Sequence, residues 1–581
     1  MSRLRESILL CLLVGAAFII GLLSFSSVHK GLNRWQETRD LKKAQAALTR
    51  GDIENAEKSA RAAITLDPNS IAACNLLAVA TEKQNRTETV AWRAQLARLA
   101  PSLDNELNLA SAALRFGQLD IARAALDKVS PNDREKAAYH VVAGWLARAE
   151  GDTAAEESHF AAAVAQEPQN QTYQFNLAVL QIQSPDPAKN SAAHDRLERL
   201  SQIAQFRTPA LRALLENAVR QNQMDVANQL GQDLQMSPDV SFGDYLLCLD
   251  LYRKLNQKKF SALLSKVKPV AARNGDDLAQ LIDWMNAHNL EAEALRWSEK
   301  LPPDFTSQPP AAIAIAASLV ATKNWSRLKR WTRNGAWGDD EYLRLAYQAY
   351  ADREARHAAA DAESDALWAS AEHEAENDPA HQLALARLAS QWKLTDEAER
   401  LWQQVAQSPA ARREALDALY QIYRATNDLP NLRLIAQRLH ESSPDEIDLA
   451  ANAARLALLL DRNTADGRQL AEQTYRKAPN DTAAAVTYAF ALYSTGRTEA
   501  ALDVLKKLPP EQLRDPHAAV YAALLFDDDN QTAIADEYVR LAKTTRLFPE
   551  ERQLLDDIAA RRQSASPAPS PNESVAPSPQ R

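Results

Sequence analysis

The sequence predicts an all-α protein built from short helical hairpins that follow one another along the chain. Its composition favours helices, with 46% hydrophobic residues but only 14 Gly among 581 residues. Apolar residues recur at positions i, i+3, i+4 and i+7, which is the spacing of an amphipathic helix. Gly, Asn and Pro interrupt these patterns at regular intervals. Because each hairpin buries its apolar stripe only against its neighbours, such an array reaches this length without one large core.

The hairpin predicted over 41–69 shows the pattern most clearly. Small residues such as Ala44 precede Gly51, and the pattern then resumes and continues to Ala63. Glycine suits the left-handed conformation that ends many helices, so Gly51 marks the turn. Pro68 cannot continue a helix and therefore ends the second one.

This hairpin resembles the tetratricopeptide repeat, whose period is about 34 residues. The small-residue positions of that family correspond here to Ala44, Ala56 and Ala63, and its closing proline to Pro68. The resemblance extends over residues 37–545 and implies a right-handed superhelical α-solenoid of helix-turn-helix repeats. The resemblance specifies the architecture strongly and says almost nothing about the function.

Later repeats depart from the family pattern. In 135–168 the small positions fall on Gly144, Glu156 and Ala163, and Phe160 is the large residue of the second helix. In 413–444, Tyr420 and Leu432 stand where small residues are expected. In 481–509 the matching residues are Tyr488, Ala491, Gly496, Ala500 and Pro509. The array is therefore predicted to consist of degenerate repeats.

The segment 8–25 carries no charge and follows a short basic stretch with Arg3 and Arg5. A helix of about 18 residues spans roughly 27 Å, enough to cross the hydrocarbon core of a bilayer. A cleaved signal peptide is the alternative, but its apolar region is normally about 7–15 residues long. We predict one transmembrane signal-anchor helix in contact with lipid. The repeats are then expected outside the cytoplasm, on the periplasmic side of a bacterial inner membrane.

The predicted organisation follows from these observations. In chain order we expect the following segments: a basic N-terminus (1–7), the transmembrane helix (8–25), a linker (26–36), regular repeats (37–240), degenerate repeats (241–378), further regular repeats (379–545), a capping helix (546–562) and a disordered Pro/Ser-rich tail (563–581).

Two basic stretches lie between Leu251 and Gly338. The second also contains several tryptophans, and cations beside flat aromatic rings suit an acidic partner. The candidate partner-binding residues are Arg253, Lys254, Lys258, Lys259, Trp325, Arg327, Lys329, Arg330, Trp331 and Arg333. The alternative is that the tryptophans pack between hairpins and the cations form a solvated face.

The sequence contains none of the motifs that accompany common catalytic or cofactor sites. GxGxxG, GxxxxGK[ST], GxSxG and HExxH are all absent. We therefore predict a protein that is not an enzyme, with no cofactor and no metal. The net charge of −9 argues against nucleic acid as a partner.

The predicted function is that of a membrane-anchored scaffold for protein–protein interaction in a cell-envelope assembly. First helices of successive hairpins would line a groove for an extended peptide or a domain of another protein. The alternative is an accessory protein that binds acidic polysaccharide during exopolysaccharide assembly or export.

Overall fold

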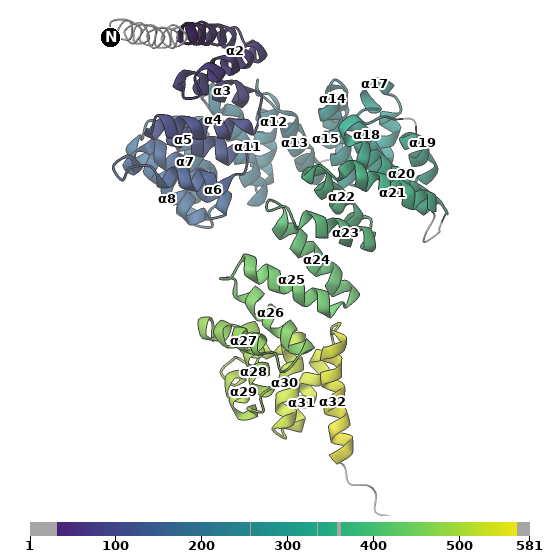
Figure 1. Ribbon diagram of the computed structural model, residues 1–581. Helices are drawn as coiled ribbons and strands as arrows, with labels where there is room; N and C mark the ends of the chain where they lie inside the picture. The colour runs from purple at the N-terminus through teal and green to yellow at the C-terminus, as the bar shows by residue number, and fades with distance from the viewer. Residues whose placement is uncertain (1–31, 256, 334, 357–361, 566–581) are drawn as a thin grey trace, which may run out of the picture. The chain divides into compact units, whose positions relative to one another are not determined.

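The computed structural model describes residues 32–565, apart from 256, 334 and 357–361. The described chain is all-α and forms two compact units, 1–270 and 271–581 (Figure 1). The predicted all-α class of helical hairpins is therefore confirmed. The predicted segments 1–7 and 8–25, the start of the linker and the tail beyond 565 lie outside the described residues. The superhelical course and the internal segment boundaries stay predictions.

The first unit begins with a helix over 32–49 and continues through paired helices. They are α2 (Ile53–Leu66), α3 (Ile71–Lys83), α4 (Glu88–Leu99), α5 (Leu103–Arg115), α6 (Leu119–Asp127), η1 (Asp133–Glu135), α7 (Ala137–Glu150), α8 (Thr153–Gln166), α9 (Gln171–Gln181), α10 (Pro187–Leu200), α11 (Ala204–Arg220), α12 (Met224–Gln235), α13 (Phe242–Leu255) and α14 (Gln257–Ala271). Helix α11 contains Pro209 within its length.

The second unit follows the same plan. Its helices are α15 (Gly275–Ala287), α16 (Glu291–Ser298), α17 (Pro303–Thr306), α18 (Ala311–Ala321), α19 (Trp325–Arg333), η2 (Gly338–Asp340), α20 (Glu341–Arg356), α21 (Ala362–Ala375), α22 (Pro379–Gln391), α23 (Thr395–Val405), α24 (Arg412–Thr426), α25 (Leu429–Ser442), α26 (Ile447–Leu460), α27 (Ala465–Lys477), α28 (Thr482–Tyr493), α29 (Thr498–Leu505), η3 (Gln512–Arg514), α30 (Pro516–Asp528), α31 (Thr532–Ala542) and α32 (Pro549–Ala565).

The turns inside the hairpins have the backbone conformation that the sequence predicted. Gly51, Gly117 and Gly151 have φ values of 79°, 69° and 80°, in the left-handed region. Asn85 and Asn222 occupy the same region, with φ values of 52° and 58°. Glycine adopts this region without steric cost, and asparagine tolerates it better than most residues. Local chemistry therefore sets where each hairpin reverses.

Small residues let paired helices approach each other closely. Ala44, Ala56 and Ala63 are at most 1% exposed, as the repeat pattern predicted. In the hairpin of α7 and α8, a Cβ on Gly144 would lie 2.8 Å from Cε1 of the buried Phe160. A methyl group would not fit at this distance, so the ring occupies the space that the glycine leaves free.

Two departures from the repeat pattern have a structural explanation. Glu156 is buried at a position expected to be small, and Arg148 Nη2 forms an ion pair with its Oε1 at 2.5 Å. The Arg148 guanidinium in turn stacks over the Trp145 ring, 4.5 Å from its centroid. In the hairpin of α28 and α29, the buried small residue is Ala501, whereas Ala500, to which the family pattern was assigned, is exposed. The correct assignment is shifted by one residue.

Candidate protein-binding site

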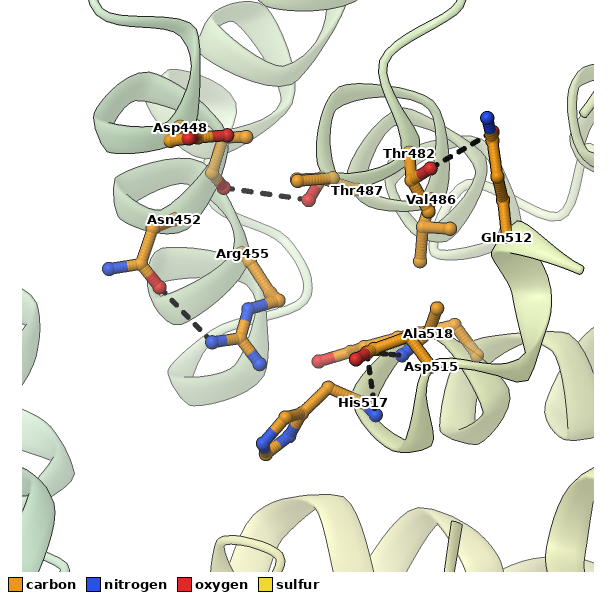
Figure 2. A pocket seen from close by; sticks show the side chains of 13 residues that line it. Asp448, Asn452, Arg455, Thr482, Val486, Thr487, Gln512, Asp515, His517 and Ala518 are labelled. Carbon is orange, nitrogen blue, oxygen red and sulfur yellow. Dashed lines mark hydrogen bonds between the residues drawn. The ribbon is translucent and has the colours of Figure 1, made fainter. Parts of the chain in front are cut away.

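A pocket of about 440 Å³ lies between successive first helices of the second unit. Its walls come from α26, α28 and the region of η3 and α30 (Figure 2). The lining residues are Asp448, Ala451, Asn452, Arg455, Thr482, Ala483, Val486, Thr487, Gln512, Asp515, His517, Ala518 and Tyr521. Each of these hairpins presents its first helix to the pocket, as the groove model predicted from the sequence requires.

Helical spacing brings the lining side chains onto one face of each helix. Asp448, Asn452 and Arg455 stand at i, i+4 and i+7 on α26, and His517 and Tyr521 stand at i and i+4 on α30. The start of α30 is held by the Asp515 carboxylate, which accepts the backbone N–H groups of His517 and Ala518 at 3.0 and 3.1 Å. This cap satisfies backbone donors at the start of α30 and so holds the first turn, which carries His517.

Arg455, which lines this pocket, belongs to a buried ion pair. The guanidinium of Arg455 donates to Glu551 Oε1 at 2.6 Å, and the Glu551 side chain is 0% exposed. The hydroxyl of Tyr521 donates to the same oxygen at 3.2 Å. His517 Nδ1 lies 3.4 Å from Glu551 Oε2, which also accepts the backbone N–H of Phe548 at 3.2 Å. The carboxylate of α32 is thus held by two first helices and by the start of its own helix.

Two further polar residues extend the cluster to a third first helix. Arg455 Nη2 donates to Asn452 Oδ1 at 3.1 Å, and Asn452 Nδ2 donates to the hydroxyl of Tyr420 at 2.9 Å. Tyr420 belongs to α24 and is the large residue that replaces an expected small one. We name the "carboxylate cluster" Tyr420, Asn452, Arg455, His517, Tyr521 and Glu551. Its members come from four helices, so only the folded unit brings them together.

The electrostatics of the carboxylate cluster favour a charged pair. Burial by itself raises the pKa of Glu551, but His517, the charge of Arg455 and the Phe548 N–H together hold it below the usual value. Burial likewise opposes the charge of Arg455, but Tyr521 and Glu551 outweigh it and raise its pKa. Burial raises the pKa of Tyr521, although the charge of Arg455 acts in the opposite direction. The tyrosine therefore stays a neutral donor to a carboxylate.

The predicted partner-binding residues divide between the two units. Arg253, Lys254, Lys258 and Lys259 belong to the first unit, and the other six belong to the second. Arg253 and Lys254, at the end of α13, are exposed. Lys259 is half-buried, donates to Asn228 Oδ1 at 2.6 Å, and lies 5.7 Å from the centroid of the Tyr252 ring.

On α19, two of the predicted cations already have partners within the chain. Arg327 forms an ion pair with Glu299 at 2.5 Å, and Lys329 pairs with Asp352, which is 1% exposed. Arg330 and Arg333 are exposed. Within the part of the chain that the structure describes, neither arginine forms an ion pair. The free positive charge of this helix is therefore concentrated at Arg330 and Arg333.

The tryptophans of the second basic stretch pack against neighbouring helices. The indole N–H of Trp331 donates to Ala312 O at 3.2 Å, and the Trp325 ring meets Tyr350 edge to face with centroids 5.7 Å apart. Trp337 is 3% exposed and contacts Tyr347. These contacts match the alternative interpretation of the aromatic residues as packing groups.

The described residues contain one group with three possible metal ligands in reach of one another, namely His194, Asp195 and Glu198. It lies on the surface of α10, where acidic side chains are common without an ion. Cys74 and Cys248 are buried and unpaired, and burial raises the pKa of Cys248 to about 12. Neither feature indicates a reactive centre.

The fold and the pocket define a scaffold of helical hairpins, a class whose surfaces suit protein–protein interaction. Residues 458–524 match the tetratricopeptide repeat family. The resemblance to the tetratricopeptide repeat that the sequence predicted is therefore confirmed, and the family match itself lies within the C-terminal repeats. The matched segment contains most of the residues that line the pocket and the whole of α28.

A search of curated proteins found no match to the sequence. Two solved structures align with the chain at low TM-scores. The crystal structure of the APC/C hetero-tetramer Cut9–Hcn1 has 11% identity and a TM-score of 0.30, over 78% of this chain and 96% of that chain. The structure of Naa15/Naa10 bound to HypK-THB has 13% identity and a TM-score of 0.23, over 91% and 77%. The family assignment rests on the sequence match.

No helix of the described residues combines the length and the apolarity that a membrane crossing requires. The segment 8–25, for which the sequence predicted that crossing, was not among those residues.

Proposed function

We propose that this chain is a scaffold that binds a segment of another protein on the first helices of its C-terminal repeats. The pocket shared by α26, α28 and α30 is the observation that carries this proposal. Alanine and valine side chains supply an apolar surface, and Asn452, Thr482 and Gln512 supply groups that can bond to a peptide backbone. A peptide segment needs both kinds of contact.

Two exposed alanines of one hairpin provide a matched test. Ala483 lines the pocket from α28, and Ala500 lies on the second helix of the same hairpin, α29. Ala483→Arg fills the pocket with a long charged side chain and should remove partner capture by the full chain from its source cells, as quantified by mass spectrometry. Ala500→Arg makes the same chemical change and should leave capture unaltered. Equal capture by both variants would show that the pocket is not the binding site.

We propose further that residues 8–25 anchor the protein in a bacterial inner membrane with the repeats on the periplasmic side. The uncharged sequence of this segment supports the proposal. A C-terminal alkaline phosphatase fusion should be active and should sediment with membranes, because the enzyme is active only outside the cytoplasm. A fusion that is inactive, while a fluorescent reporter at the same site is bright, would place the repeats in the cytosol.

The accessory glycan-binding function is the alternative. Sugar recognition by stacking needs accessible aromatic faces, and the packing of Trp325, Trp331 and Trp337 withdraws much of that surface. The protein scaffold is the better supported of the two functions. Quenching of tryptophan fluorescence by an acidic polysaccharide would make the glycan-binding function the better supported one.

A further inference from the structure

Helix α32 lies along the first-helix side of the C-terminal repeats. It packs against α30 and also contacts α26, which lies two hairpins earlier in the chain (Figure 1). At its far end, Arg562 forms ion pairs with Asp527 and Asp536 at 2.6 Å each. Just before the helix, Arg546 donates to Ala425 O in α24 at 3.2 Å. The helix predicted as a cap therefore occupies the face on which a bound partner would lie.

The side of α32 that faces the repeats has a simple pattern. Glu551, Leu554, Leu555 and Ile558 stand at i, i+3, i+4 and i+7, and none of them is more than 4% exposed. An acidic residue thus begins an otherwise apolar stripe. Glu551 is also the third residue of α32 and accepts the N–H of Phe548, so one carboxylate both starts the helix and docks it.

The pocket reaches the residues that hold Glu551, although Tyr521 is only 1% exposed. Arg455, His517 and Tyr521 also line the pocket described above. The Arg455 side chain keeps 17% of its surface exposed, although its ion-pair partner is fully buried. A carboxylate from outside the chain could therefore approach the guanidinium through the pocket. Exchange of one carboxylate for another re-forms the ion pair with Arg455, so it avoids the cost of leaving a buried charge unpaired.

We propose that the face formed by α26 and α30 binds an amphipathic helix of a partner protein and that α32 occupies this face in the partner's absence. The partner helix would carry an acidic residue followed by apolar residues three, four and seven positions later. This inference rests on the proposed scaffold function and names the partner's chemistry and the regulation of its site.

The test uses the full chain with a protease cleavage site inserted between Thr544 and Thr545, in the loop before α32. Cleavage leaves α32 bound without a covalent link, so it competes on equal terms with an added peptide. A fluorescent peptide with the sequence of residues 547–565 should exchange into the site, as followed by anisotropy. All measurements use this same cleaved protein. Circular dichroism after cleavage checks that its helix content is unchanged.

Unlabelled competitors then report what the site recognises. The Glu551→Gln version of the peptide should compete at least about tenfold less well, since it loses charge-assisted hydrogen bonds. A designed helix that keeps only the acid and the three apolar residues on an Ala/Gln background should compete within about tenfold of the natural sequence. That result would support recognition of a partner class rather than of α32 alone.

Three results would overturn the proposal. In the first, the designed helix fails while the natural peptide competes, which would make α32 a cap specific to this chain. In the second, the Gln peptide competes as well as the natural one, so the carboxylate is not recognised. In the third, the intact chain forms a dimer that the peptide dissociates, which would assign the face to a second copy. Capture that is lost with Ala483→Arg would uphold the scaffold function in each of these cases.

Discussion

Lys329→Glu should destabilise the second unit by about 3–5 kcal/mol, the usual cost of removing one partner from a buried ion pair. The Lys329 ammonium pairs with Asp352, which is 1% exposed, across the contact between α19 and α20. Glutamate would place a second carboxylate beside the first, without any cation. Among the described residues, no other ion pair or hydrogen bond of Asp352 compensates for that loss. The midpoint of urea denaturation, followed by circular dichroism, measures the effect.

The control for this prediction lies one residue further along α19. Arg330 is exposed and without an ion-pair partner among the described residues, so Arg330→Glu should change stability by no more than about 0.5 kcal/mol. Replacing both lysine and aspartate by apolar residues, Lys329→Met with Asp352→Leu, should restore most of the loss. A Lys329→Glu protein as stable as wild type would mean that the pair does not hold α19 to α20.

The internal ion pairs of Arg327 and Lys329 affect how the predicted partner-binding residues of α19 should be tested. A variant that reverses Arg327, Lys329 and Arg330 together would break two internal ion pairs, so lost binding could follow from lost structure. Arg330→Glu with Arg333→Glu changes only the exposed charge of α19. This double variant should abolish the binding of an acidic partner, while the midpoint of urea denaturation stays unchanged.

Arg455→Met should cost the second unit about 3–5 kcal/mol at pH 7, because it leaves the buried Glu551 carboxylate without its guanidinium. The effect should depend on pH in a defined direction. In the wild type, the pKa of Glu551 lies below the usual value, so its contribution is complete above about pH 4.3 and is lost as the pH falls through the folded-state pKa. Wild-type stability should therefore decrease in acid.

The stability that Arg455→Met loses relative to wild type should become smaller as the pH falls. Removal of Arg455 takes away one of the groups that oppose burial, so the pKa of Glu551 should rise, while the contacts with His517 and the Phe548 N–H remain. The difference in unfolding midpoint between variant and wild type should then shrink between pH 7 and pH 5. A double variant, Arg455→Met with Glu551→Leu, should lose this pH dependence. A penalty that is constant over this pH range would show that the carboxylate is compensated by other groups.

The sequence by itself determined the local features of this protein. Gly51, Gly117 and Gly151 mark hairpin turns because few other residues adopt a positive φ without strain. Ala44, Ala56 and Ala63 mark helix contacts because only small side chains allow close approach. These signals depend on neighbours within one repeat, and the repeat period makes them recur. Even here, the burial of Ala501 in place of Ala500 shows that a one-residue shift escapes the pattern.

The candidate site was decided by the tertiary structure. Arg455 and Glu551 are 96 residues apart, and no local spacing connects them. The unusual Tyr420 was the one signal that marked this region, and its partner Asn452 appears only when α24 and α26 are packed. Likewise, Arg327, Lys329 and Arg330 look equivalent in the sequence, but the first two form ion pairs with carboxylates just after α16 and on α20. Periodicity gives the face of a helix, whereas the partner of a charged side chain depends on which helix covers that face.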